Sequence, residues 1–219
     1  LLESCGYSVQ LAHVGCCQRT RISHGFLRQA KKDGFRTLCK LGPFIDQGIP
    51  IVVCEPSCAS ALTDDLPDLM EDESLAKRIE SNVYLIDVFI AREIESGRLK
   101  CEFASDSSQF LVHGHCHQKS IFGTAAMKTI LGRVPGATVH EIDSGCCGMA
   151  GSFGYEKEHY KISENIGSRR LFPAVRNADE KTTVVACGFS CRHQINHFTG
   201  RRACHWVETL TGRNSHHDN

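Results

Sequence analysis

Two hydrophobic patterns alternate along the chain, one typical of strands and one typical of helices. Runs of β-branched and apolar residues predict strands over 7–15, 49–58, 136–145 and 182–191. Apolar residues spaced three to four apart predict helices over 22–45, 74–97 and 155–175. Strands that alternate with helices are typical of parallel sheets flanked by helices, so the predicted fold class is α/β.

Cysteine motifs divide this pattern into two similar halves. A vicinal pair and a Cys-x3-Cys motif each occur twice, with copies 130 and 133 residues apart: Cys16-Cys17 and Cys146-Cys147, then Cys54/Cys58 and Cys187/Cys191. Two kinds of motif kept at nearly one offset indicate a duplicated unit. We therefore expect two pseudo-symmetric halves, a first repeat over 1–100 and a second over 101–219, each with a small, mostly parallel sheet.

The first repeat is expected to be the less complete of the two. Cys116 lies 30 residues before Cys146, and its counterpart 130 residues earlier would precede Leu1. The sequence also has neither an initiator Met nor a signal-peptide pattern. These observations indicate a fragment whose first repeat lacks its opening segment and one ligand. At the other end, residues 212–219 are expected to be disordered or a tail.

Composition narrows the function classes. The 219 residues can bury a substantial core, and 25 basic residues balance 25 acidic ones. This balance argues against nucleic acid or an anionic membrane as a partner. No apolar run approaches the ~20 residues that a membrane span needs. We therefore expect a protein without a transmembrane segment, located in the cytoplasm or peripherally at the inner membrane.

The 13 cysteines are the unusual feature of the composition. A disulfide framework is one interpretation, but the count is odd, the core is too large to need cross-links, and a bridge within a vicinal pair is strained. Clustered thiols favour metal ligation or redox chemistry, with reduced bystanders as the third alternative. Four cysteines have no partner in the repeat and are expected to be packing residues: Cys5, Cys39, Cys101 and Cys204.

The candidate metal ligands lie where predicted strands lead into helices. Such loops present backbone N–H groups and the positive end of a helix dipole, which favour thiolates. In the second half the candidates are Cys116, Cys146, Cys147 and Cys191, with Cys187 as a fifth; in the first half they are Cys16, Cys17, Cys58 and Cys54. All-thiolate sites suit iron–sulfur clusters or Zn. A phosphate-binding loop is disfavoured because the glycines of "GCCGMAGSFG" match neither nucleotide motif.

Three histidines alternate around Cys116 in "HGHCHQKS". On a strand, His113, His115 and His117 would share the face opposite Cys116. One of them could bind or tune a metal. The favoured interpretation is that all three are exposed or hydrogen-bonded at a strand end.

The motifs "HGHCHQKS", "GCCGMAGSFGYEKEHYKIS", "CEPSC" and "ACGFSCRHQI" resemble the cysteine-rich CCG domain family. This family includes the B-type subunit of heterodisulfide reductase and the iron–sulfur subunit of glycolate oxidase. The motifs are most similar to the C-terminal part of FAD-linked oxidases of the D-lactate/glycolate dehydrogenase type. The closing motif differs, since heterodisulfide reductases have Cys-x2-Cys. In the oxidase branch the second cysteine is the expected ligand, which favours Cys58 and Cys191 over Cys54 and Cys187.

The resemblance implies a [4Fe–4S]-type cluster, cubane or noncubane, in each half that retains its ligands. It also implies FAD on another domain or on a partner subunit, and a quinone or another molecule as the electron acceptor. The first functional hypothesis is thus an electron-transfer module of a flavin-linked 2-hydroxy-acid dehydrogenase. The alternatives are a heterodisulfide-reductase-like catalytic module and a non-enzymatic scaffold that binds Zn.

Overall fold

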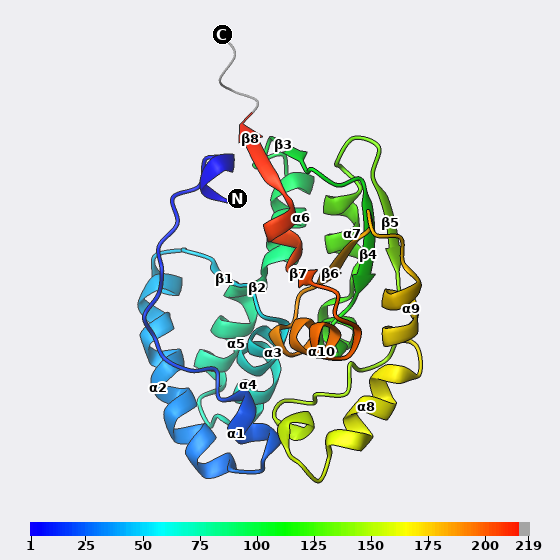
Figure 1. The fold of residues 1–219 in the computed structure, drawn as a ribbon. Helices are drawn as coiled ribbons and strands as arrows, with labels where there is room; N and C mark the ends of the chain where they lie inside the picture. Colours follow the sequence, from blue (N-terminus) through cyan, green and yellow to red (C-terminus); the bar gives the residue numbers. More distant parts are fainter. Residues whose placement is uncertain (215–219) are drawn as a thin grey trace. The chain divides into compact units, whose positions relative to one another are not determined.

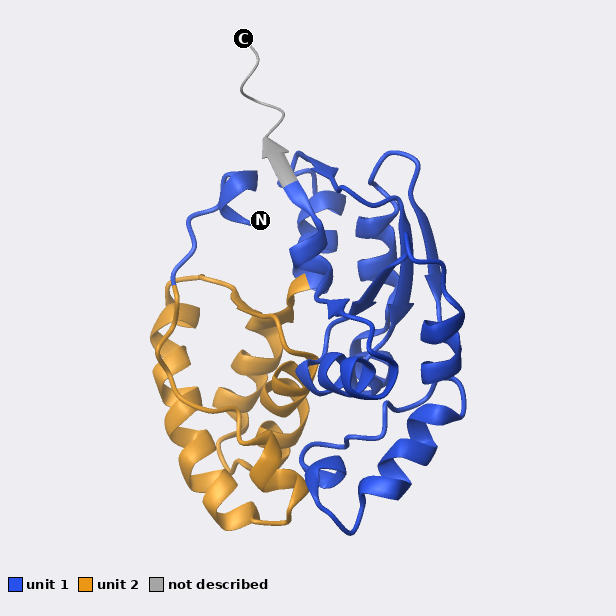
Figure 2. Ribbon diagram, viewed as in Figure 1, with its two compact units in different colours: residues 1–10, 87–219 blue, residues 11–86 orange. Residues whose placement is uncertain are grey.

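The computed structural model describes residues 1–214, with side chains as far as residue 211. It divides the chain into two compact units, which Figure 2 shows in different colours. We call residues 11–86 the small unit, and residues 1–10 together with 87–219 the large unit. The boundary predicted at residue 100 was drawn from the spacing of the repeated cysteine motifs. That the chain is a duplicated unit stays a prediction.

The small unit is a two-stranded parallel sheet with helices around it. Strand β1 (Ile51–Val53) pairs with β2 (Val83–Leu85), and Val52 lies opposite Tyr84. The helices are α1 (Arg19–Ser23), α2 (Leu27–Asp46), α3 (Pro56–Ser60), η2 (Ala61–Asp65), α4 (Leu66–Leu69) and α5 (Glu73–Asn82). One buried face of α2 meets α4 and α5 in a core of Leu38, Leu41, Ile45, Leu62, Leu66, Leu75, Ile79 and Val83.

The large unit is built on a four-stranded parallel sheet of order β5-β4-β6-β7. Its strands are β4 (Gln109–His113), β5 (Thr138–Glu141), β6 (Thr183–Ala186) and β7 (Ala203–Cys204). Central strand β4 pairs Val112 with Glu141 on one side and His113 with Ala186 on the other. The three longer strands therefore end at the same edge. The α/β class predicted from the sequence is confirmed.

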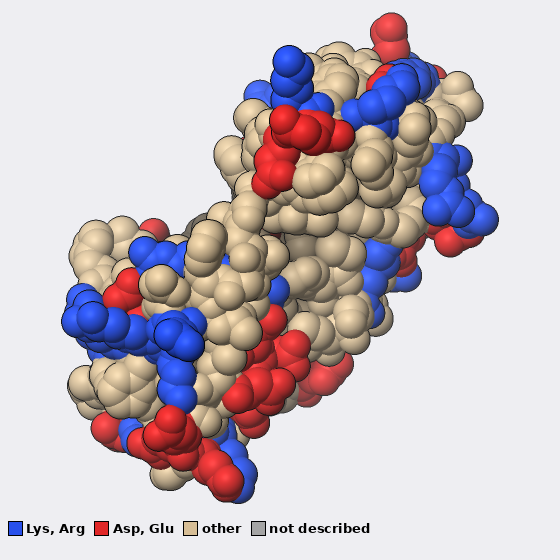
Figure 3. All heavy atoms as spheres, turned by 90° about the horizontal axis from the view of Figure 1, so that it is seen from below, with Lys and Arg blue, Asp and Glu red and all other residues tan. Residues whose placement is uncertain are grey.

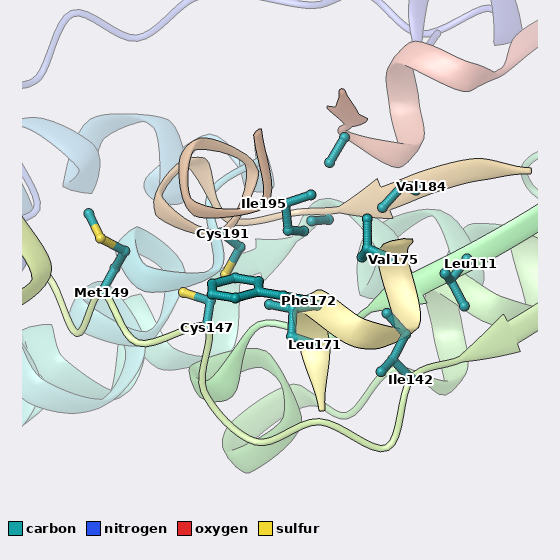
Figure 4. Close-up of a cluster of buried hydrophobic side chains, with 12 residues drawn as sticks. Leu111, Ile142, Cys147, Met149, Leu171, Phe172, Val175, Val184, Cys191 and Ile195 are labelled. Carbon is teal, nitrogen blue, oxygen red and sulfur yellow. The ribbon is translucent and has the colours of Figure 1, made fainter. Parts of the chain in front are cut away.

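Helices of the large unit flank this sheet, as Figure 1 shows. They are α6 (Ile86–Glu95), which starts at the last residue of the small unit, η3 (Gln118–Phe122), α7 (Ala125–Leu131), η4 (Phe153–Tyr155), α8 (Tyr160–Ser168), α9 (Leu171–Asn177), α10 (Phe189–Thr199) and η5 (Trp206–Thr209). Helices α9 and α10 enclose a buried cluster that holds Phe172, Ile195 and two candidate ligands, Cys147 and Cys191 (Figure 4). The candidate site therefore lies at one end of a hydrophobic core.

A second, antiparallel sheet joins distant parts of the large unit. Strand β3 (Cys101–Ala104) pairs with β8 (Thr211–Asn214), beside the short helix η1 (Glu3–Cys5). Cys5 and Cys101 form a disulfide with a Cα–Cα distance of 5.6 Å. The expectation that both are packing residues was wrong, because the cross-link joins positions 96 apart in sequence. Of the tail expected over 212–219, residues 212–214 pair in β8, and 215–219 lie outside the described part of the chain.

Three predicted elements differ in the structure. The helix expected over 155–175 is divided into α8 and α9 by a turn at residues 169–170. The helix expected over 74–97 is interrupted by β2, because the buried residues Val83 and Leu85 pair with β1 instead of continuing the turn. Tertiary pairing here overrides the helical period. The strand expected over 7–15 is irregular backbone, mostly exposed, and it pairs with no described strand. In the small unit, the pair Cys16-Cys17 therefore follows irregular backbone instead of the expected strand.

The surface agrees with the balanced composition. Figure 3 shows basic and acidic side chains interspersed on the face that it displays, as the equal numbers of the two predict. Within residues 1–214, no helix is both long enough and apolar enough to cross a membrane.

Asp87 is a buried carboxyl group at the start of α6. Its two oxygens accept hydrogen bonds from the Gln118 side chain at 2.7 Å and from the Val88 N–H at 3.0 Å. Burial raises the pKa of Asp87 to about 6. Because the unfolded chain releases this proton near pH 4, the group makes the fold less stable as pH rises from about 4 to about 6. The native pKa lies about two units above the unfolded value, which corresponds to a decrease of about 3 kcal/mol in the free energy of unfolding.

We therefore expect Asp87→Asn to remove this pH dependence. Urea unfolding of both chains between about pH 4 and about pH 7 should show the variant gaining relative stability as pH rises, by about 3 kcal/mol in total. The native pKa of Asp87 is above its unfolded value, so its destabilising effect is complete above the native pKa and absent at low pH. A constant difference across this range would contradict the assignment.

Candidate metal centre

The carboxyl edge of the four-stranded sheet brings the second-half cysteines together. Cys116 follows β4, the Cys146-Cys147 pair follows β5, and Cys191 lies in the first turn of α10 after β6. Ligands of open parallel sheets gather outside this edge, because the loops that leave it converge. The parallel sheet predicted from the sequence therefore explains why cysteine motifs that are distant in the sequence meet.

The sulfurs of these residues form a continuous series, which we call the four-cysteine group (Cys116, Cys146, Cys147 and Cys191). The Cys116 thiol hydrogen-bonds to Cys146, Cys146 contacts Cys147, and Cys147 contacts Cys191. The Cys147 and Cys191 sulfurs lie within 4.8 Å of each other, and both residues are buried. Figure 4 draws the two side chains among the hydrophobic residues around them. Cys116 and Cys146 are half-buried. Convergence of this kind is what a shared metal centre requires.

Protons are distributed unevenly over the four-cysteine group. The hydrogen bond from Cys116 lowers the pKa of Cys146, and the bond from Cys147 lowers the pKa of Cys191. The same two bonds raise the pKa values of the donors, Cys116 and Cys147, because each donor must keep its proton to make the bond. Without a cation, the group thus favours alternating thiols and thiolates, because adjacent buried thiolates repel. A bound metal ion would allow all four to ionise.

The loop that carries the vicinal pair is held by glycine and lysine. Gly148 has φ +101°, and its N–H donates to the Cys146 sulfur at 3.2 Å. A Cβ at this position would lie 2.3 Å from the Ser163 carbonyl oxygen. The Lys119 ammonium donates to the carbonyl of Gly145 at 3.1 Å and to that of Ser144. Its positive charge therefore lies next to the loop that would hold a thiolate cluster.

We expect Gly148→Ala to destabilise the large unit by about 3 kcal/mol, since it combines a left-handed backbone with a clash against main chain. Gly145→Ala is the matched control, because a Cβ there meets nothing within 4 Å. Its unfolding free energy should change by less than about 0.5 kcal/mol. Chemical denaturation measures both. Similar values for the two variants would contradict the predicted constraint at Gly148.

The small unit brings together Cys16, Cys17 and Cys58, which we call the three-cysteine group. The sulfurs of Cys17 and Cys58 are 3.0 Å apart, and Cys16 contacts Cys17. The hydrogen bond from Cys58 lowers the pKa of Cys17 to about 6, with a further contribution from the Arg19 backbone N–H. Thr37 donates to the Cys16 carbonyl at 3.2 Å and so ties the loop to α2. This group has three sulfurs where the large unit has four.

Cys54 and Cys187, the first cysteines of the Cys-x3-Cys motifs, have different surroundings. The Cys187 sulfur packs 3.3 Å from the Met127 sulfur, on the side of α7. Cys54 is exposed in the turn between β1 and α3. Their roles as ligands stay predictions, and the structure places neither in the two sulfur groups described above.

The histidines around Cys116 do not share a face, because β4 ends at His113. His113 is fully buried, and its Nδ1 lies 2.8 Å from the Ser144 hydroxyl. His115 is also buried, and its Nδ1 accepts from the His117 backbone N–H at 3.2 Å. The expectation of one shared face was wrong for this reason, whereas these hydrogen bonds agree with the favoured interpretation. No sequence signal marks Ser144 as the partner of His113.

A groove of about 740 Å³ lies along α10, the helix that bears Cys191, although none of the four cysteines lines it. Met149 from the vicinal-pair loop contributes to its lining, and the exposed rings of Tyr155 and Phe189 contribute to its sides. Phe189 stacks on His193 at a centroid distance of 5.2 Å, and the Tyr155 hydroxyl lies 3.3 Å from His193 Nδ1. The groove therefore offers flat aromatic surfaces next to the helix that bears Cys191.

Fold and sulfur groups together define a cysteine-rich α/β module with thiols gathered at strand ends. The chain is 26% identical over 212 residues to one subunit of the anaerobic glycerol-3-phosphate dehydrogenase of Escherichia coli (strain K12), covering 96% of this chain and 52% of the relative. D-2-hydroxyglutarate dehydrogenases of the same strain and of Pseudomonas putida are 26% and 24% identical, with 96% of this chain and 20% of each relative covered. No family model matches the chain.

The similarity to these dehydrogenases extends over nearly the whole of this chain. The chain spans about half the length of the glycerol-3-phosphate dehydrogenase subunit and a fifth of the D-2-hydroxyglutarate dehydrogenases. It is therefore similar to one part of each of two kinds of oxidoreductase.

Proposed function

We propose that this chain is an iron–sulfur electron-transfer module of a larger flavin-linked dehydrogenase. The observation that carries the proposal is the four-cysteine group, in which three strand ends deliver sulfurs that contact one another. The names of the relatives support the oxidoreductase class, because each is a dehydrogenase or a dehydrogenase subunit. A 2-hydroxy acid is the substrate class that we propose for the whole protein.

The residues present fit a cluster of the [4Fe–4S] type. Four thiols in contact are the donor set of an all-cysteine cluster, and in the absence of a cation their pKa values are driven apart. The bound cluster would supply one-electron chemistry. Cys116, Cys146, Cys147 and Cys191 would hold it, and the Gly148 N–H would donate to a ligand sulfur. Phe172 and Ile195 would exclude water from its buried side.

Electrons would enter from FAD on another domain or subunit and leave to an acceptor. The groove along α10 supports a flat aromatic acceptor such as a quinone, because the exposed residues Phe189 and Tyr155 line it. Aromatic rings bind one another in offset or edge-to-face arrangements. Location in the cytoplasm or peripherally at the inner membrane remains part of this proposal.

The test is anaerobic reconstitution of the full chain with iron and sulfide. We expect bound iron and sulfide in equal amounts and a broad visible absorbance that dithionite bleaches. Bound Zn with no iron uptake would instead support the structural scaffold. Reduction of a disulfide substrate by the reconstituted chain would support the heterodisulfide-reductase-like alternative and overturn a purely electron-transferring role.

A further inference from the structure

His113 is a fully buried imidazole at the end of β4, directly beside the four-cysteine group. One of its ring nitrogens and the sulfurs of Cys147 and Cys191 all lie within 4.8 Å of one another. Nδ1 is engaged by the Ser144 hydroxyl at 2.8 Å. No nitrogen or oxygen of the described residues pairs with Nε2, and the ring lies within hydrogen-bonding reach of the Cys191 sulfur. A sulfur is a weak hydrogen-bond partner, so the position of this buried ring beside two sulfurs needs an explanation.

Ser144 can hold the His113 ring in an orientation that leaves Nε2 free to bind a metal. The Ser144 hydroxyl also lies 3.5 Å from the Ile142 carbonyl, which can only accept. This contact permits the hydroxyl to donate to Ile142 while its oxygen accepts from His113 Nδ1–H. In this tautomer Nε2 carries a lone pair. Histidines that bind metals show the same arrangement, with one nitrogen donating to a fixed partner and the other binding the ion.

We propose that His113 Nε2 is a ligand of the metal centre, next to Cys147 and Cys191, and that Ser144 fixes its orientation. The inference rests on the proposed function and makes His113 a fifth donor beside four thiolates. A cubane cluster with four cysteine ligands has no position for it, so the inference favours the noncubane form of the cluster. Imidazole and thiolate together suit iron and zinc. A neutral ligand also reduces the negative charge of a cluster, and histidine ligation raises the potential of iron–sulfur centres.

The first experiment detects the iron–nitrogen bond directly. The full chain is reconstituted with iron and sulfide, reduced, and studied by pulsed EPR with and without ¹⁵N-labelled histidine. We expect a strongly coupled histidine nitrogen that responds to the label, disappears in His113→Gln and persists in His140→Gln, an exposed histidine on β5. A reduced cluster without a coupled nitrogen, or a signal unchanged in His113→Gln, would overturn the proposal.

Cobalt(II) titration gives a second readout that does not depend on iron–sulfur assembly. Loss of the supporting hydroxyl in Ser144→Ala should weaken cobalt binding by about 10–100-fold, the usual effect of removing such a partner. His113→Cys should retain binding and add a sulfur-to-cobalt absorbance band. Equal affinities and spectra for the wild-type chain and His113→Gln would overturn the assignment of His113. Failure to take up iron, by contrast, would count against the proposed function alone.

Discussion

Cys147→Ser is expected to remove the metal centre of the large unit. Cys147 is 4% exposed, and its sulfur contacts both Cys146 and Cys191, so it is central to the four-cysteine group. Structural metal sites with four ligands bind with about 10–16 kcal/mol, or roughly 3 kcal/mol for each ligand. Loss of one ligand should therefore weaken binding by about 100-fold or more. Iron and sulfide analysis after reconstitution measures the effect.

Cys204→Ser is the matched control for this prediction. Cys204 is half-buried in β7 of the same sheet, outside both sulfur groups, so its replacement tests packing without changing a candidate ligand. We expect unchanged iron content and an unfolding free energy within about 1 kcal/mol of the wild-type value. Cys116→Ser and Cys146→Ser should behave like Cys147→Ser. Equal iron loss in all four variants would point to unfolding and against ligation.

The reconstituted chain is expected to hold about four irons and not about eight. The large unit has four sulfurs in contact, a full set for an all-cysteine cluster, whereas the three-cysteine group has Cys16, Cys17 and Cys58. A site that lacks one thiolate leaves iron open to water and is coupled more weakly to folding. The number of irons bound per chain of 219 residues should therefore be set by the cysteines of the large unit.

Paired variants separate the two sulfur groups. Cys17→Ser should leave most of the iron in place, while Cys146→Ser should remove it. Exposed Cys54 is the residue that could complete the small-unit site by rearrangement. About eight irons per chain, with half of them lost in Cys54→Ser, would contradict the predicted asymmetry.

Local patterns were sufficient for most of the elements near the candidate ligands, but they gave no bounds for β4, the central strand that precedes Cys116. The β-branched runs predicted β1, β5 and β6, and the helical spacing predicted α2. Failures occurred where a distant partner decides. Val83–Leu85 continues a helical period in sequence, but it lies opposite β1 and pairs with it. Residues 7–15 have strand-like composition without a neighbouring strand to receive their hydrogen bonds.

The cysteine spacing by itself predicted that Cys116, Cys146, Cys147 and Cys191 meet, because parallel strands open their loops at one edge of a sheet. The family resemblance favoured Cys191 over Cys187, and only the tertiary structure supplies the physical reason. Both follow β6, but Cys187 packs against Met127 of α7, while the first turn of α10 directs Cys191 to the vicinal pair. The burial of His113 and the Cys5–Cys101 disulfide were decided in the same way. Each depends on side-chain direction or on contacts between distant segments, which no local period in the sequence encodes.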